Sequence, residues 1–105
     1  AVCWARENLS ALIRIPAENG EGKRMELRSP DPSCNVYLAF ALIIYAGTEG
    51  VIGGEVLPAE YEGNAFECGG NVKTLPENLY LAVKTAKEGE FVKKYLSEKI
   101  FRTFI

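Results

Sequence analysis

The sequence predicts an α+β fold: antiparallel hairpin strands, then a buried helix, then C-terminal helices. Two short segments in which apolar and polar residues alternate predict the hairpin. One long segment that is apolar on nearly every side predicts the buried helix, and apolar residues at helical spacing predict the helices of the last third. The chain has 105 residues, which is enough for one small domain.

The hairpin is predicted from two segments on either side of a turn. In Ser10–Pro16 (SALIRIP) and in Lys23–Pro30 (KRMELRSP), apolar and polar residues alternate as the side chains of a β-strand do. The connection, Ala17–Gly22 (AENGEG), has the asparagine and glycines that are typical of a turn. Because this connection is longer than two residues, the sequence leaves the register of the two strands open.

The buried helix is predicted over Val36–Ala46. Asn35 or Ser33 can cap its start, and Gly47 or Gly50 can end it. A chain this short has little material to surround such a helix, so we expect some of its partner elements to be missing. The apolar stretch is shorter than the roughly 20 residues that a membrane-spanning helix needs, so we expect no membrane partner.

The rest of the chain is predicted as a long loop followed by three helices. Val51–Val72 is rich in Gly, Pro and Glu without periodicity, which is typical of a functional or mobile loop. Thr74–Glu77 (TLPE) matches a capping box for a helix that is interrupted at Gly89. Glu90–Leu96 and Ser97–Ile105 predict two further short helices, the second capped by its own first serine. The apolar positions of the first helix are Leu79, Ala82, Val83 and Ala86.

Composition and charge exclude several classes of protein. A formal net charge of -2 argues against a broad nucleic-acid-binding surface, so we expect no nucleic-acid partner. The chain has no histidine and cannot form a Ser–His or Cys–His catalytic pair from its own residues. Its three cysteines, an odd number without paired spacing, favour a reducing cytosol and buried apolar positions. These cysteines are Cys3, Cys34 and Cys68.

The two ends lead us to expect a piece cut from a longer protein. Ala1–Trp4 reads as apolar strand rather than as a polar tail. At the other end an apolar stripe continues to the last residue, whereas natural termini are usually polar and frayed. The alternative is a C-terminal helix that docks on the rest of the fold. The stripe consists of Ile100, Phe101, Phe104 and Ile105.

Four charged residues of the predicted hairpin form the candidate functional site. Alternate residues of a strand lie about 7 Å apart on one face, so Arg24, Glu26 and Arg28 form a cation–anion–cation row. Arg14 joins that face if it pairs with an even-numbered residue of the other strand. Arginines bind phosphate and carboxylate oxygens, and a carboxylate between them has a lowered pKa and stays ionised, as a metal ligand should.

This mixture of cations and one oxygen ligand is what phosphoryl transfer with Mg²⁺ or Mn²⁺ requires. The alternative is a solvated strand face with cross-strand ion pairs that only stabilise the hairpin. Charged alternation is common on half-buried hairpins. The pattern by itself therefore does not choose between a phosphoryl-transfer site and a structural one.

Longer motifs in the chain resemble one enzyme family. Asn8–Pro16 (NLSALIRIP), Arg24–Pro32 (RMELRSPDP) and Asn35–Leu38 (NVYL) closely resemble the C-terminal block of glutamine synthetases. Leu75–Leu79 (LPENL) and Ser97–Ile105 (SEKIFRTFI) look like the last helices of that family. The resemblance covers most of the chain and is weakest in the middle loop.

The resemblance implies that residues 1–105 are a C-terminal fragment of the glutamine synthetase catalytic domain, truncated at both ends. The family joins glutamate and ammonium through a γ-glutamyl phosphate, using ATP and Mg²⁺ or Mn²⁺. Carried over by motif, Arg14 and Arg24 would bind the ATP phosphates and Glu26 would ligate a metal. Arg28 would be catalytic, because it would hold the substrate glutamate or its phosphorylated carboxyl group.

The resemblance also implies a setting for the site. The intact parent would be a large homo-oligomeric ring in the cytoplasm, with active sites between subunits. The family's other metal ligands and its N-terminal domain are not in this sequence, so we expect the isolated chain to be inactive. We also expect it to be poorly soluble or to associate, because its apolar helix would leave hydrophobic surface uncovered.

The sequence departs from the family pattern in its first motif. The family usually has Asn-Arg-Ser, and Leu9 replaces the arginine that reaches the ATP phosphates and the substrate. Arg6 is a candidate to replace that arginine. Two alternatives stay open: a γ-glutamylamine ligase that uses a larger amine, and a non-catalytic relative that binds nucleotide. Phe66 falls where some bacterial members have a tyrosine that is adenylylated, so we do not expect that control.

Overall fold

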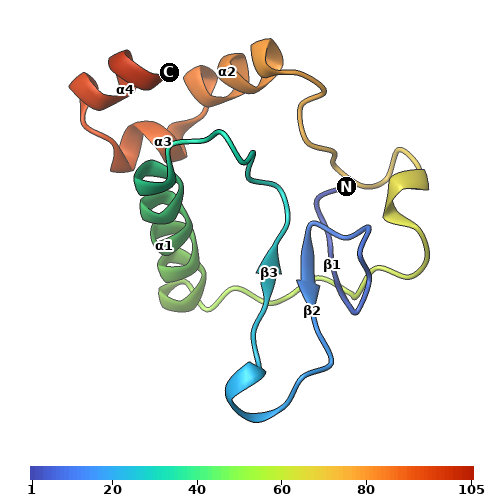
Figure 1. Cartoon of the computed structure of the whole chain (residues 1–105). Coiled ribbons are helices and arrows are strands. Elements are labelled where there is room, and N and C mark those ends of the chain that lie inside the picture. The colour runs from blue at the N-terminus through green and yellow to red at the C-terminus, as the bar shows by residue number, and fades with distance from the viewer. The chain divides into compact units, whose positions relative to one another are not determined.

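The computed structural model describes all residues, Ala1–Ile105. They form two compact units. The sheet unit comprises Ala1–Ser33 and Val56–Leu75, and the helical unit comprises Cys34–Glu55 and Pro76–Ile105. One three-stranded sheet and four α-helices make the chain α+β, which confirms the predicted fold class (Figure 1).

The sheet unit is built on three short strands. β1 (Trp4–Arg6), β2 (Ile13–Ile15) and β3 (Glu26–Leu27) form a sheet in the order β1-β2-β3, coloured from dark blue to cyan in Figure 1. β2 and β3 are antiparallel, which confirms the predicted hairpin. Their register, which the sequence left open, pairs Arg14 with Glu26.

β1 was not part of the predicted hairpin and runs parallel to β2. Part of the long loop Val51–Val72 packs beside β1. Nε1 of Trp4 donates a hydrogen bond to the carbonyl of Pro58 at 2.7 Å, and the amide of Tyr61 donates to the carbonyl of Trp4 at 3.0 Å. The buried side chains of this unit are all small, and hydrogen bonds therefore connect its segments more than an apolar core does. They are Ala5, Ala11, Pro16 and Ala65.

The predicted loop over Val51–Val72 is largely irregular, as expected. Its first two residues belong to the helix before it, and a 3₁₀ turn, η2 (Ala65–Glu67), interrupts the rest. Asn64 begins this turn, and its side-chain oxygen accepts a hydrogen bond from the amide of Phe66 at 3.0 Å. The other 3₁₀ turn, η1 (Gly20–Gly22), lies in the connection between β2 and β3.

α1 (Val36–Ile52) is longer than predicted. Asn35 caps it as expected, because its side-chain oxygen accepts hydrogen bonds from two backbone amides of the first turn. The predicted end at Gly47 or Gly50 is wrong, since the helix continues through both glycines. A glycine inside a helix costs only about 1 kcal/mol. The helix ends where Gly54 adopts a φ of 61°, which favours glycine.

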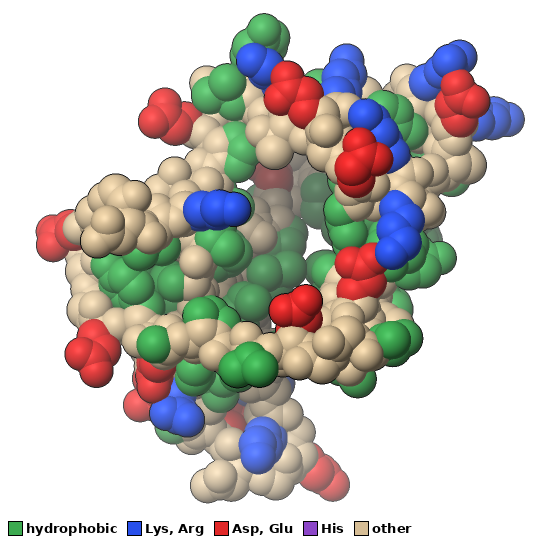
Figure 2. Space-filling view, turned by 180° about the vertical axis from the view of Figure 1, so that it is seen from behind, with side chains coloured by type: hydrophobic (Ala, Val, Ile, Leu, Met, Phe, Trp, Pro, Cys, Tyr) green, Lys and Arg blue, Asp and Glu red, His purple; other side chains and the backbone are tan.

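The helix that was expected to be buried has no buried side chain within these 105 residues. Tyr37, Phe40 and Ile44 are 83%, 62% and 66% exposed. The space-filling view likewise shows hydrophobic side chains at the surface (Figure 2). The other helices of the unit therefore cover only part of α1. No helix of the structure has both the length and the apolar character needed to span a membrane.

The last three helices follow the prediction except at their first cap. α2 (Leu79–Glu88) begins after Asn78, whose side chain accepts a hydrogen bond from the amide of Leu81 at 2.9 Å. The predicted capping box at Thr74–Glu77 is therefore wrong, since an asparagine nearer the helix provides an equally good cap. α3 (Glu90–Tyr95) and α4 (Glu98–Phe104) follow, and a serine caps α4 as expected.

Candidate functional site

The four predicted site residues lie together, although Arg24 and Arg28 flank β3 rather than belonging to it. Cross-strand partners point to the same face, so the pairing of Arg14 with Glu26 brings the arginine of β2 beside the row of β3. Nη1 of Arg14 lies 2.9 Å from Oε2 of Glu26, and Nη2 of Arg24 lies 3.0 Å from its Oε1. Nη1 of Arg28 lies 3.7 Å from Oε2. We call Arg14, Arg24, Glu26 and Arg28 the arginine row.

Glu26 is the common partner of the arginine row. The hydrogen bond from Arg14, with a further one from Arg24, lowers the pKa of its carboxyl group, while partial burial acts in the opposite direction. The carboxylate is therefore ionised at neutral pH, as the sequence predicted. It is an acceptor that three cations share, so it holds their guanidinium groups in fixed positions.

Arg14 is the most enclosed arginine of the row. It lies on the central strand, and its side chain is 21% exposed. One terminal nitrogen donates to Glu26, and the buried Nε has no hydrogen-bond partner. A buried donor without a partner costs about 1–3 kcal/mol. Because this Nε is enclosed, a further anion would have to bind Arg14 at its terminal nitrogens.

Arg24 contacts a carboxylate that the sequence analysis did not single out. Its Nη1 lies 3.1 Å from Oε2 of Glu18 and donates to the carbonyl of Gly22 at 3.2 Å. The hydrogen bond with Glu18, followed by the one with Glu26, raises the pKa of Arg24 above its ordinary value. The segment Ala17–Gly22 carried only turn signals, and no periodicity relates a turn residue to a strand residue six positions later.

The arginine row can bind anions but cannot by itself hold a metal. Three guanidinium groups and one carboxylate give it a net positive charge, which suits phosphate and carboxylate ligands. Divalent cations such as Mg²⁺ need about six oxygen ligands. The chain has no group of three or more carboxylate, cysteine or histidine side chains that could hold a metal ion. Glu26 could therefore supply only one ligand of a larger set.

Arg6 does not join the arginine row. In the parallel register Ala5 pairs with Arg14, so Arg6, the next residue of β1, points to the opposite face of the sheet. Its guanidinium group forms a 3.0 Å ion pair with Glu60. Arg6 thus lies away from the arginine row.

The Asn8-Leu9-Ser10 motif connects the segment between β1 and β2 to the long loop. Oδ1 of Asn8 accepts hydrogen bonds from the amide and the hydroxyl of Ser10, and its Nδ2 donates to the carbonyl of Gly63 at 2.8 Å. The hydroxyl oxygen of Ser10 accepts from the amide of Ala65 at 2.8 Å. The side chain of Leu9 is 60% exposed. The polar residues of the motif therefore hold the loop, and the leucine takes no part in these bonds.

Two smaller expectations concern Phe66 and the cysteines. Phe66 lies in η2 with 79% of its surface exposed. The cysteines are free and only partly buried, so their expected role as buried fillers is only partly met. They are Cys3, Cys34 and Cys68.

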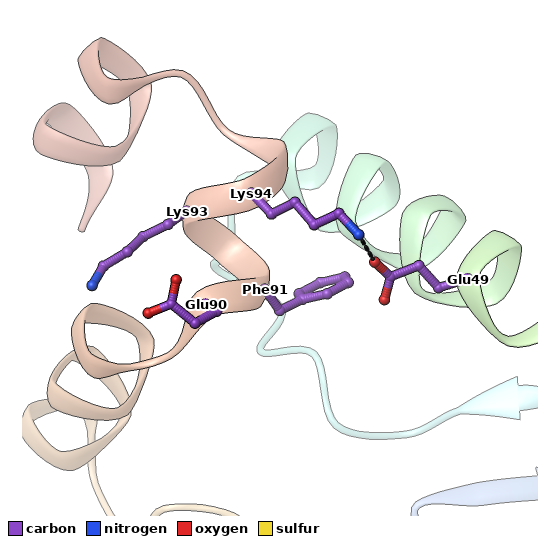
Figure 3. Close-up of a pocket in the computed structure, with 5 residues that line it drawn as sticks. All are labelled: Glu49, Glu90, Phe91, Lys93 and Lys94. Atoms are coloured by element: carbon purple, nitrogen blue, oxygen red, sulfur yellow. Dashed lines mark hydrogen bonds and ion pairs between the residues drawn. The ribbon is translucent and has the colours of Figure 1, made fainter. Parts of the chain in front are cut away.

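A depression of about 470 Å³ lies between α1 and α3 in the helical unit and contains no predicted site residue (Figure 3). Nζ of Lys94 lies 2.6 Å from Oε1 of Glu49 there, and Phe91 points toward α1. Tyr95 stacks on Tyr45 with ring centroids 4.1 Å apart. Because the lysine and the glutamate of the depression pair with each other beside packed aromatic rings, we interpret it as a helix–helix contact.

Comparisons with known proteins identify the family of the chain. The chain matches the family model for the glutamine synthetase catalytic domain over residues 1–105. It is 42% identical over 110 residues to glutamine synthetase of Thermotoga maritima and 41% identical over 111 residues to that of Methanosarcina mazei. It is 38% identical over 110 residues to glutamine synthetase of Methanococcus voltae. Each comparison covers 99% of this chain and 25% of the relative, so the chain spans about a quarter of the length of these curated relatives. On this evidence the chain belongs to the glutamine synthetase family.

Proposed function

We propose that this chain is part of an ATP-dependent glutamate–ammonia ligase and supplies its phosphate- and glutamate-binding arginines. The observation that carries the proposal is the arginine row, in which one ionised carboxylate holds three guanidinium groups on one face of a sheet. Sites that transfer phosphoryl groups act mainly by positioning and by stabilising negative charge, and both need fixed cations.

The proposed roles follow from the chemistry of the reaction. The γ-carboxylate of glutamate attacks the γ-phosphorus of ATP, and ADP leaves; ammonia then attacks the acyl carbon, and phosphate leaves. Arg14 and Arg24 would bind the ATP phosphates, because guanidinium groups match phosphate oxygens and stay charged. Arg28 would hold the glutamate carboxyl group as it becomes phosphorylated. Of the three arginines it has the longest contact with Glu26, 3.7 Å, so it loses the least ion-pair energy when it turns to a ligand.

We propose Glu26 as one ligand of Mg²⁺ or Mn²⁺, with the remaining ligands outside these residues. A divalent cation, when bound, offsets charge on the phosphates. Glu26 is suited to contribute because its lowered pKa keeps it ionised at neutral pH. In this proposal Glu26 also aligns the three arginines, and that role does not require the metal.

The rest of the proposal concerns the whole protein. The chain spans about a quarter of its relatives' length, and its four site residues are too few to bind and orient three substrates. We propose that the isolated chain is inactive, and that the active form is a cytoplasmic homo-oligomeric ring that shares its sites between subunits.

One observation favours a second candidate, a relative that binds nucleotide without turnover. Leu9 occupies the position of a family arginine, and Arg6 lies on the other face of the sheet. This candidate predicts an intact phosphate site with the reaction lost.

The test measures ADP release by the full-length polypeptide that contains this chain, with ATP, Mg²⁺ and glutamate. Adding ammonium or a panel of amines identifies the nucleophile. Ammonium-dependent release supports the ligase. Release with organic amines alone would indicate a γ-glutamylamine ligase, and ATP binding without release would indicate the non-catalytic relative.

A further inference from the structure

Arg24 has no free terminal nitrogen in this structure. Nη1 contacts Glu18 at 3.1 Å and the carbonyl of Gly22 at 3.2 Å, and Nη2 contacts Glu26 at 3.0 Å. A guanidinium group binds phosphate most strongly when it donates two parallel hydrogen bonds. An anionic ligand that uses both terminal nitrogens of Arg24 must therefore compete with the two carboxylates for them.

The two carboxylates differ in how firmly they are held. Glu26 lies on β3 and has three arginine partners. Glu18 lies in the turn before β3, is 51% exposed, and has Arg24 as its only ion-pair partner. Displacing Glu18 from Arg24 therefore costs less free energy than displacing Glu26.

The turn also leaves room for this contact. A Cβ atom at Gly22 would lie 2.2 Å from Oε2 of Glu18, which is closer than two such atoms can approach. The carboxylate of Glu18 thus occupies the space that a side chain at position 22 would fill. Any other residue there would push the flexible end of Glu18 away from Arg24.

We propose that Glu18 is an internal competitor for Arg24: it occupies the guanidinium group when the site is empty and lowers the affinity for the polyphosphate of a nucleoside triphosphate. This inference rests on the proposed function, because it assumes that the arginine row receives phosphates. Glu18 touches no reacting atom and acts only through Arg24. It sets how much nucleotide is needed to fill the site.

The size of the effect follows from the exposure of the pair. The two side chains are 48% and 51% exposed, so solvent screens their attraction. Removing such a competitor should tighten binding by about two- to fivefold at low salt. The gain should shrink as ionic strength rises, because the Debye length falls to about 3 Å at 1 M salt.

The experiment is isothermal titration calorimetry of the full-length protein with Mg²⁺ and the non-hydrolysable β,γ-imido analogue of ATP. We expect Glu18→Gln to bind the analogue about two- to fivefold more tightly than the wild type. Glu21→Gln is the matched control, because it removes the same charge from the same turn at a residue without an ion pair, and we expect less than half of that gain. Gly22→Ala should also tighten binding, without changing the net charge.

Combination with Arg24→Ala separates competition from general electrostatics. In that background we expect Glu18→Gln and Glu21→Gln to have equal effects. Unchanged or weaker binding by Glu18→Gln, or equal effects of the two variants in the wild-type background, would overturn the inference while leaving a nucleotide-binding ligase intact. Failure of the wild type and of Glu18→Gln to bind the analogue at all would overturn both the inference and the proposed function.

Discussion

In the sheet unit, polar contacts join segments that are far apart in the sequence, whereas in the helical unit aromatic packing adds to the polar contacts of Glu49 with Lys94 and Tyr95. Trp4, Arg6 and Asn8 each form a hydrogen bond with a residue more than 50 positions away. In the helical unit, Tyr45 of α1 stacks on Tyr95 of α3. Polar contacts fix direction as well as distance, so they suit a unit that must hold charged side chains in defined positions.

The sheet unit and the helical unit also differ in what each contains on its own. The sheet unit completes the arginine row with its own residues, and its buried side chains are three alanines and one proline. The helical unit buries a single side chain, Leu96, and exposes most of the apolar surface of α1. The sheet unit therefore carries the chemistry that we propose, and the helical unit carries a surface that needs further cover.

The largest effect should come from the arginine row. In the full-length protein, Arg28→Ala and Glu26→Ala should each lower the rate of ADP release by roughly 10²–10³, because each removes a preorganised charge that the transition state needs. The matched control is Arg102→Ala, since Arg102 forms only an exposed ion pair with Glu98 one helical turn away. An equal loss in Arg102→Ala would mean that the row has no special role.

The next effect concerns the uncovered surface of the helical unit. We expect light scattering to show that the isolated chain associates. Phe40→Glu combined with Ile44→Glu should raise the concentration at which it associates by about tenfold. Val56→Glu, in the sheet unit, is the control, because Val56 is 89% exposed but lies outside α1. A monomeric wild-type chain at high concentration would contradict this prediction.

A smaller effect should follow from the polar contacts of the sheet unit. Asn8→Ala removes the acceptor of two hydrogen bonds and the donor of a third, so we expect it to lower the free energy of unfolding by about 1–3 kcal/mol. Urea denaturation measures this change. Asn19→Ala should have little effect, because the exposed side chain of Asn19 makes no capping hydrogen bond. Equal effects would show that the long-range bonds of Asn8 do not stabilise the unit.

The smallest effect is a pH dependence in the helical unit. The hydrogen bond from Lys94, and then that from Tyr95, lowers the pKa of Glu49 below its usual value of 4.5. The stabilisation is present above that value and is lost as the pH falls through the lowered pKa, because the unfolded chain binds the proton first. In urea denaturation between pH 6 and 3, Glu49→Gln should lose less stability than the wild type. Parallel curves would contradict the prediction.

The sequence predicted what depends on local pattern and missed what depends on distant partners. Alternation predicted the strands of the hairpin, and it grouped Arg24, Glu26 and Arg28, of which both arginines contact the glutamate. The parallel pairing of β1 with β2 was missed, and so were the contacts of β1 with the long loop, whose residues lie more than 50 positions away. The contact of Glu18 with Arg24 was missed because a turn has no periodicity that relates it to a strand face.

Helix boundaries show the same limit on a smaller scale. Asn35 was one of the two predicted caps and is the one observed, since the signal and the bond lie in one turn. The end of α1 was wrong because two interior glycines cost less than the helix gains by continuing. The roles of the arginine row were not derivable from pattern, since a stabilising hairpin face has the same alternation.

The central claim is that the arginine row of the sheet unit binds the phosphates of ATP. The most direct test is a crystal structure of the full-length protein with the β,γ-imido analogue of ATP. We expect phosphate oxygens about 2.7–3.2 Å from the guanidinium nitrogens of Arg14 and Arg24, with Glu18 displaced. Phosphates bound elsewhere, with Arg24 still paired to Glu18 and Glu26, would contradict the claim.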